Sequence, residues 1–199
     1  MGLLFLGTLQ GQKLVEKAFL GSHVQSIQID AGPCYRIDLV TGTTDQVEIV
    51  AHMEGEYARD LMISMKEEAA TLKIGVGFQP GFNSPNDKLS AHKVVSIALA
   101  ISLPSQKRVQ LFGTGCHVRA TGDYRHLEIS LSDGSCHLEA VGERVEASTQ
   151  QGDIWLLTAS GQVQAHSEYG QVLGEKVPPG APQFVLHSVE GDIHIRKTK

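Results

Sequence analysis

Histidine is frequent in this chain, with nine residues among 199. Two imidazole groups at the spacing of neighbouring strands can hold a transition metal. Two sets occupy equivalent places in a repeat that is described below: His166 with His187, and His137 with His194, the second set including Trp155. A metal site and two rows of ordinary surface histidines both fit this pattern, and the sequence leaves the choice open.

Two carboxylates also occupy equivalent places, because Glu128 and Glu146 are separated by one repeat. Carboxyl groups about 5 Å apart suit a retaining glycosidase. The sequence places no aromatic platform for a sugar beside them, so a solvated face explains them more simply. We therefore expect no catalytic residue.

Aspartates follow the turn glycines in two repeats, as Asp153 and Asp192. Such turns bind calcium in some solenoids, but those proteins use dense Gly-Gly-x-Gly-x-Asp nonapeptides, which this chain lacks. An aspartate side chain after a turn commonly hydrogen-bonds nearby backbone amides. We expect that role here, and neither a metal nor another cofactor.

The three cysteines, Cys34, Cys116 and Cys136, are too few and too scattered for a disulfide framework or a zinc motif. Cys136 falls at an inward position of a repeat, where a thiol acts as a small buried hydrophobic group. One disulfide and three free thiols both remain open from the sequence.

The elements that must position these residues form a repeat in the second half of the chain. Short apolar-alternating runs start 18 residues apart, and a second set, each member beginning at a glycine, keeps step with the first. The last copy follows after 21 residues, and the three extra residues fall in the proline-rich stretch 178–182. The first set starts at Val109, Leu127, Val145, Val163 and Phe184, and the second at Gly134, Gly152, Gly170 and Gly191.

A fixed period near 20 residues with two strands per period is typical of a solenoid. We predict an all-β fold, a single-stranded β-solenoid or β-roll with coils of about 18 residues over 105–199. Period-2 alternation predicts an irregular β-rich part over 22–104, with strands from Val24 onward and a surface loop at 79–91. Both parts would belong to one domain, 22–199, and residues 1–12 resemble the remnant of a signal peptide.

Composition narrows the functional classes. A hydrophobic content of 41% and a charged content of 20% are ordinary for a globular protein. The net charge of −5 argues against a nucleic-acid partner, and no apolar run is long enough for a transmembrane segment.

With the repeats laid out, the chain resembles the bacterial family of unknown function named "putative adhesin", and the related head domain of putative auto-transporter adhesins. The features that carry the resemblance are Ser-Ile-Gln-Ile-Asp at 26–30, Ile-Ser-Leu-Pro at 101–104, and Gly-Asp-Ile at 152–154 and 191–193. The resemblance covers roughly residues 22–196. It implies a β-solenoid or β-roll that is usually exported and has no established catalytic residues.

We therefore expect an exported binding or structural module, located in the periplasm, at the cell surface or outside the cell. Its partner would be a surface glycan or a protein. Two alternatives remain: a carbohydrate-active enzyme on a β-helix, and a cytosolic polymer-forming β-solenoid. The contact face would be the outward surface where aromatic and imidazole groups gather, namely His137, Trp155, His166, His187 and His194.

Overall fold

The computed structural model describes residues 12–55, 57–82 and 95–198, and most of these residues lie in β-strands. One 3-10 helix, η1 (Ala58–Asp60), is the only helical element among these residues. The all-β prediction is confirmed. The strands are β1 (Gln12–Phe19), β2 (Ser26–Asp30), β3 (Arg36–Gly42), β4 (Gln46–Glu54), β5 (Leu61–Glu68), β6 (Thr71–Phe78), β7 (Ser96–Pro104), β8 (Arg108–Gly115), β9 (His117–Asp123), β10 (His126–Asp133), β11 (Cys136–Gly142), β12 (Arg144–Gln151), β13 (Ile154–Thr158), β14 (Gln162–Ser167), β15 (Val172–Gly174), β16 (Gln183–Ser188) and β17 (Ile193–Lys197).

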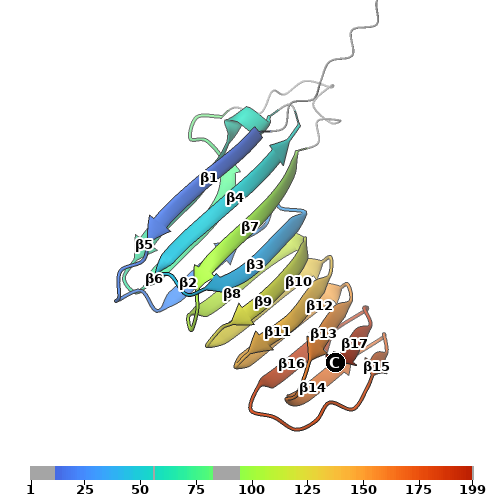
Figure 1. The fold of residues 1–199 in the computed structure, drawn as a ribbon. Helices are drawn as coiled ribbons and strands as arrows, with labels where there is room; N and C mark the ends of the chain where they lie inside the picture. The colour runs from blue at the N-terminus through green and yellow to red at the C-terminus, as the bar shows by residue number, and fades with distance from the viewer. Residues whose placement is uncertain (1–11, 56, 83–94, 199) are drawn as a thin grey trace, which may run out of the picture.

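These strands form two open sheets that run the length of the molecule (Figure 1). Sheet A has nine strands in the order β1-β4-β7-β3-β9-β11-β13-β17-β15. Sheet B has eight strands in the order β14-β16-β12-β10-β8-β2-β6-β5. From β8 onward, successive strands alternate between the two sheets, so that each repeat contributes one strand to each layer.

Both sheets mix parallel and antiparallel pairs, and the antiparallel pairs gather at the N-terminal end. β4 pairs antiparallel with β1 and β7, and β5 pairs antiparallel with β6. β2 and β3 instead pair in parallel with their neighbours on both sides, β2 with β6 and β8 and β3 with β7 and β9. The parallel pairing therefore extends through β2 and β3 to β6 and β7, well before the regular repeats, and the antiparallel strands β1, β4 and β5 close the N-terminal end.

The prediction that strands begin near Val24 is wrong, because β1 already pairs with β4 from Gln12 to Phe19. Alternation was a weak signal there, since Lys13, Glu16 and Lys17 interrupt the apolar residues of an edge strand. The expected signal remnant at 1–12 lies outside the described residues except for Gln12. The expected loop at 79–91 is described only as far as residue 82, where it forms a turn.

The 18-residue step predicts the strand register of the first three coils correctly. Leu127 pairs with Val109 on one side and with Val145 on the other, each 18 residues away. In the other layer, Cys136 pairs with Val118 and Ile154 at the same step. Equal spacing aligns equivalent residues on neighbouring strands, so inward residues stack on inward residues.

The last two coils do not stack in chain order, which corrects the simple succession that the repeat suggests. Strands β16 and β17 lie between the β12–β13 coil and the β14–β15 coil. Phe184 accordingly pairs with Val145 on one side and with Val163 on the other. The proline-rich segment carries the chain from β15 back to β16, and Gly161 and Gln162 donate backbone hydrogen bonds to the carbonyls of Pro178 and Pro182. This return path explains why the last step is 21 residues.

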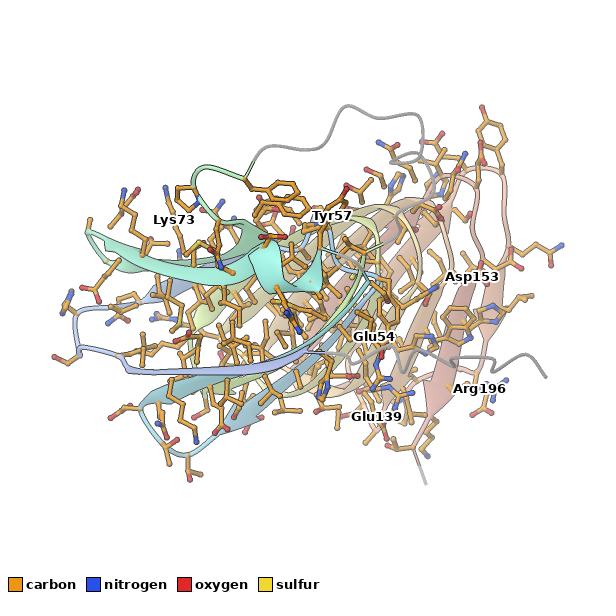
Figure 2. All side chains as sticks on the ribbon, turned by 90° about the horizontal axis from the view of Figure 1, so that it is seen from above. Glu54, Tyr57, Lys73, Glu139, Asp153 and Arg196 are labelled. Atoms are coloured by element: carbon orange, nitrogen blue, oxygen red, sulfur yellow. The ribbon has the colours of Figure 1, made fainter. Side chains whose placement is uncertain are left out.

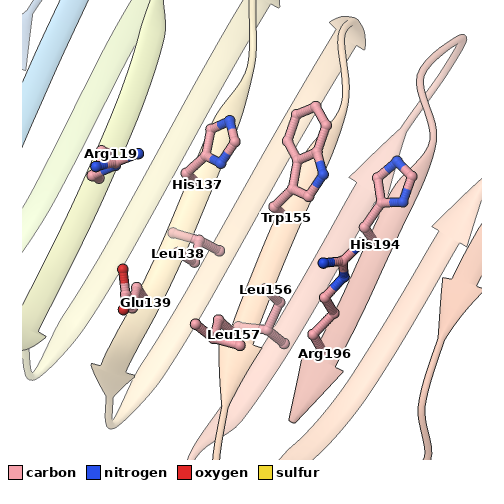
Figure 3. Close-up of a pocket in the computed structure, with 9 residues that line it drawn as sticks. All are labelled: Arg119, His137, Leu138, Glu139, Trp155, Leu156, Leu157, His194 and Arg196. Atoms are coloured by element: carbon pink, nitrogen blue, oxygen red, sulfur yellow. The ribbon is translucent and has the colours of Figure 1, made fainter. Parts of the chain in front are cut away.

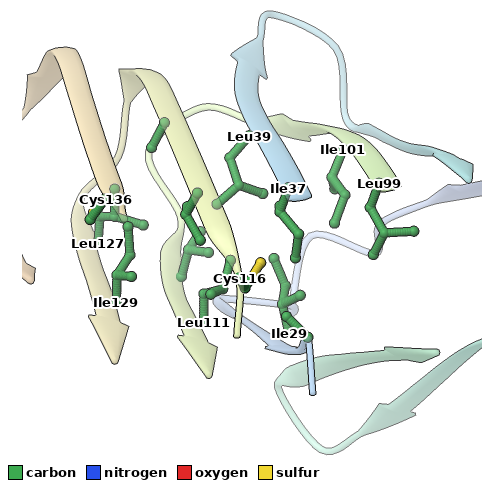
Figure 4. Close-up of a cluster of buried hydrophobic side chains, with 14 of the residues drawn as sticks. Ile29, Ile37, Leu39, Leu99, Ile101, Leu111, Cys116, Leu127, Ile129 and Cys136 are labelled. Carbon is green, nitrogen blue, oxygen red and sulfur yellow. The ribbon is translucent and has the colours of Figure 1, made fainter. Parts of the chain in front are cut away.

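The apolar faces of the two sheets pack against each other and form one core along the molecule (Figure 4). Inward residues from sheet A, such as Ile37 and Ile101, meet those from sheet B, such as Ile29 and Leu111. Seen from above, Glu139 projects from one layer and Lys73 from the other (Figure 2). The outward faces of sheets A and B therefore lie on opposite sides of the molecule.

Glycines stack at the turn that leads from sheet B to sheet A. A Cβ on Gly152 would overlap the carbonyl oxygen of Gly134, and one on Gly191 would overlap the carbonyl of Gly152. Only glycine permits this approach of backbone to backbone. Below the turn, the buried hydroxyls of Thr149 and Ser188 hydrogen-bond to each other at 3.0 Å and to the carbonyl of Gly152 at 2.7 and 3.2 Å. The turn polar groups are thus satisfied inside the stack.

Candidate functional site

The five residues expected to form one contact face lie on opposite faces of the molecule. His137, Trp155 and His194 are on β11, β13 and β17 of sheet A. His166 and His187 are on β14 and β16 of sheet B. The sequence aligned each set correctly within its own row, but a single face cannot include both. All three residues of the sheet A set line one groove on the surface.

The three sheet A rings form a continuous stack across three neighbouring strands (Figure 3). The Trp155 ring centre lies 4.3 Å from that of His137 and 5.1 Å from that of His194, with planes within 4° and 9° of parallel. These separations match the spacing between strands. The rings therefore cover one another's facing sides, and all three residues remain partly exposed.

A second outward row runs beside the rings, two residues further along each strand. It contains Glu139, Leu157 and Arg196, which are paired in register across β11, β13 and β17. A groove of about 270 Å³ lies between this row and the rings, with Arg119 at its β9 end (Figure 3). The three rings thus form one wall of the groove. The other wall is formed by Leu157, which lies between Glu139 and Arg196.

A second hollow of about 380 Å³ continues the groove toward the N-terminal end. Arg119 and His137 line both hollows, and Arg36, Asp38 and His117 line only the second. Arg36 donates to the Asp38 carboxylate at 2.6 Å, so these two charges compensate each other. The two hollows form one surface across β3, β9, β11, β13 and β17, which we call the sheet A groove.

The charges of the sheet A groove are mainly positive. Arg119 and Arg196 are exposed, and neither makes an ion pair with any residue that the structure describes. Partial burial, followed by the nearby charges of Arg119 and His117, lowers the pKa of His137 despite the opposing effect of Asp153. At neutral pH the uncharged His137 ring can then stack on Trp155 without the cost of burying an extra charge.

Sequence reasoning missed Arg119, Glu139, Leu157 and Arg196. Leu157 and Arg196 were within reach of the same register argument, since they stand two residues beyond the predicted ring row. Arg119 and Glu139 were within reach of it too, because Arg119 pairs with His137 at the 18-residue step and Glu139 pairs with Leu157.

On sheet B, the His166 and His187 rings stack with centres 5.8 Å apart. Nε2 of His187 lies 3.6 Å from a carboxylate oxygen of Glu168. Among the described residues, no group of three or more His, Cys, Asp or Glu side chains converges as a metal site would require.

The two glutamates that suggested a glycosidase are held by neighbouring side chains. Glu146 accepts hydrogen bonds from Nε of Arg144 at 2.8 Å and from His126 at 3.1 Å, and Glu128 accepts one from Gln110 at 2.8 Å. The Arg144 hydrogen bond is the main cause that lowers the pKa of Glu146. A general acid needs the opposite shift.

The turn aspartates bind backbone amides of the next coil. A carboxylate oxygen of Asp153 accepts the N–H of Asp192 at 2.8 Å, and Asp192 in turn accepts the N–H of Gln171 at 2.8 Å. This ladder runs β13, β17, β15, in the same order as the strands. It agrees with the turn-stabilising role expected from the sequence.

All three cysteines are free and buried, which settles the choice left open by the sequence. Burial raises the pKa of each thiol to about 12. Because the thiolate is the reactive form, these residues act as packing groups in the folded protein.

No helix among the described residues is long and apolar enough to cross a membrane. The sequence matches no known family model and no curated protein. Solved structures do show similarity. A putative cell adhesion protein from Clostridium sporogenes superposes with a TM-score of 0.66 at 12% identity, over 95% of this chain and 100% of the other.

Two further solved proteins give lower TM-scores. A putative adhesin from Bacteroides fragilis gives 0.34 at 14% identity, over 94% of this chain and 97% of the other. One from Parabacteroides distasonis gives 0.33 at 8% identity, over 94% and 98%. The chain therefore has the fold of the Clostridium sporogenes protein, and the resemblance to putative adhesins drawn from the sequence is confirmed at the level of the fold.

Proposed function

We propose that this protein is a non-catalytic, adhesin-like binding module whose sheet A groove contacts an extended partner, a surface glycan or a protein. The observation that carries the proposal is the groove itself, which crosses five strands and is lined by a stack of three rings. Small-molecule sites are usually concave pockets that enclose the ligand. An open groove across parallel strands suits a long partner better.

The proposal includes an architecture: residues 22–199 form a single domain built as a β-solenoid, with 105–199 as its regular coils and β1 added at the N-terminal end. The alternation of strands between two sheets and the common core support it. Repetition gives the outward rows a constant spacing, and such rows are the surfaces that repeat proteins use for binding.

A carbohydrate-active enzyme is the alternative that fits less well. The proposed acids, Glu128 and Glu146, lie on sheet B, on the face opposite the sheet A groove. Both are engaged by neighbouring side chains, and the lowered pKa of Glu146 disfavours proton donation. If the protein hydrolysed a polysaccharide, and Glu128→Gln or Glu146→Gln removed that activity, the function would be that of an enzyme and not of a binding module.

We propose further that the module is exported to the periplasm, the cell surface or the medium. The support is the fold shared with a protein named as a putative cell adhesion protein. Fractionation of cells that produce the full chain should recover it outside the cytosol. Recovery in the cytosol alone would contradict export.

A polymer-forming solenoid is a second candidate, favoured by one observation: strands β14 and β15 stand at open sheet edges. Unpaired edge strands can pair with another chain. Sedimentation at rising protein concentration distinguishes the candidates, since a binding module keeps a constant mass and a polymer does not.

The binding proposal is tested on an array that carries surface glycans and host-surface proteins. Trp155→Ala should remove binding of whichever partner is found, because it deletes the centre of the ring stack. Tyr169→Ala is the matched control, since Tyr169 is an aromatic residue, 80% exposed, that does not line the groove. Equal binding by both variants would contradict the proposal.

A further inference from the structure

We infer that the sheet A groove takes an acidic polysaccharide, whose carboxylate or sulfate groups pair with Arg119 and Arg196. The inference rests on the proposed binding function and names the chemistry of the partner. Its basis is a pair of exposed arginines at the two ends of the hollow of about 270 Å³, one on β9 and one on β17, with the three rings between them.

The local charge contrasts with that of the chain. The protein carries a net charge of −5, yet the groove holds two uncompensated arginines against one glutamate, Glu139. Asp38 adds no free negative charge, because Arg36 donates two hydrogen bonds to it at 2.8 and 2.6 Å. A positive groove on an acidic protein favours an anionic partner over a neutral or cationic one.

The guanidinium groups are free to bind. Neither Arg119 nor Arg196 has an ion-pair partner among the described residues, so a ligand replaces water and not a protein contact. Guanidinium groups bind carboxylates and phosphate-like oxyanions through paired N–H donors. Each arginine can thus hold one acidic group of a ligand.

The spacing of the two arginines selects a polymer over a small anion. Arg119 lies on β9 and Arg196 on β17, three strand spacings apart across β11 and β13, or roughly 14 Å. The whole groove spans five strands, or roughly 19 Å. A single small anion reaches only one arginine, whereas an extended acidic polymer reaches both.

The groove between the arginines suits sugar rings. The edges of Trp155, His137 and His194 carry N–H groups that donate to hydroxyls, and Leu157 offers an apolar contact on the opposite wall. Hydrogen-bond donors beside an apolar surface match the mixed faces of a pyranose ring. A protein segment rich in acidic residues could pair with the same arginines, but it lacks the regular row of hydroxyls that these N–H donors can bind.

The inference is tested by calorimetric titration of the full chain with three polymers of similar length: polygalacturonate, which carries carboxylates, dextran sulfate, which carries sulfates, and neutral dextran. We expect binding to at least one acidic polymer and none to dextran. Arg119→Gln/Arg196→Gln should weaken that binding about tenfold. The control Arg108→Gln/Arg125→Gln removes the same charge from exposed positions outside the groove.

The outcomes distinguish a failure of this inference from a failure of the proposed binding function. Equal loss in both double variants would show charge attraction without a site and would overturn the inference. Binding of a neutral glycan or a protein that depends on Trp155, without binding of either acidic polymer, would overturn the inference and leave the binding function standing. No Trp155-dependent binding to any partner would overturn both. The two acidic arms identify whether carboxylate or sulfate is preferred.

Discussion

Two neighbouring coils with the same sequence pattern differ sharply in burial. In the β16–β17 coil, Phe184 and Ile193 are fully buried. Their register partners in the β14–β15 coil are Val163, which is half-buried, and Val172, which is 46% exposed. The inner coil has neighbours on both sides and the end coil on one only. In a stacked fold, the pattern sets which residues face inward, but the neighbours decide how much water those residues lose.

The largest expected effect comes from a charge placed at paired inward positions. Ile193→Asp buries an unpaired carboxylate and should destabilise the protein by more than about 4 kcal/mol, enough to unfold the C-terminal coils. Val172→Asp leaves its carboxylate in contact with water and should cost about 1 kcal/mol or less. Urea unfolding followed by circular dichroism measures both. Similar losses in the two variants would contradict the stacking order.

The turn glycines provide the next test. Gly152 lies between the glycine turns of two other coils, and Gly152→Ala would force the carbonyl of Gly134 away. We expect a loss of about 3 kcal/mol, comparable to other changes that overpack a fixed backbone. Gly115→Ala is the control, since no atom lies within 4 Å of the added Cβ. Thermal unfolding should show a lower Tm for Gly152→Ala alone.

The serines below the turns should show a smaller difference. Ser188 accepts from the N–H of Gly191 at 2.9 Å and is fully buried, so Ser188→Ala leaves that N–H without a partner and should cost about 2 kcal/mol. Ser167 makes the equivalent bond to Gly170 at 3.0 Å but is only half-buried. Water can replace its hydroxyl, and Ser167→Ala should cost about half as much. The order of the two losses in urea unfolding is the result to check.

Much of this architecture could be predicted from the sequence, and the reasons for the failures are physical. The 18-residue step fixed which residues pair across the first three coils, because parallel strands align equivalent positions. The order of the last two coils was hidden, since register is the same whichever neighbour a coil selects. The only signal was the longer, proline-rich connection before Phe184.

The candidate site shows the same limits. The row of His137, Trp155 and His194 followed from register alone. The assignment of His166 and His187 to the same surface failed, because the two strands of one coil face opposite sides of the molecule. Charge pairing is a property of side-chain geometry, so the free arginines and the engaged glutamates were beyond the reach of the repeat pattern.

The smallest expected effect is a pH dependence of the protein's stability that comes from His137 in the sheet A groove. The pKa of His137 is lowered in the folded protein, so the folded state binds fewer protons than the unfolded state around and below pH 6.5. Its contribution to stability is therefore largest above the ordinary histidine pKa and falls as pH drops through 6.5 toward the lowered value. His137→Gln should flatten this part of the Tm profile between pH 7.5 and 5. An unchanged slope would contradict the stated environment of the ring.

The central claim, that the sheet A groove is the contact face, can be measured directly because the chain has a single tryptophan, Trp155. Its fluorescence reports on the ring stack in the groove and on no other site. Titration with a polymer that binds by calorimetry should change the emission of Trp155, or shield it from acrylamide quenching, with saturation at the calorimetric Kd. Calorimetric binding that leaves both the emission and the quenching of Trp155 unchanged would place the contact face elsewhere on the molecule.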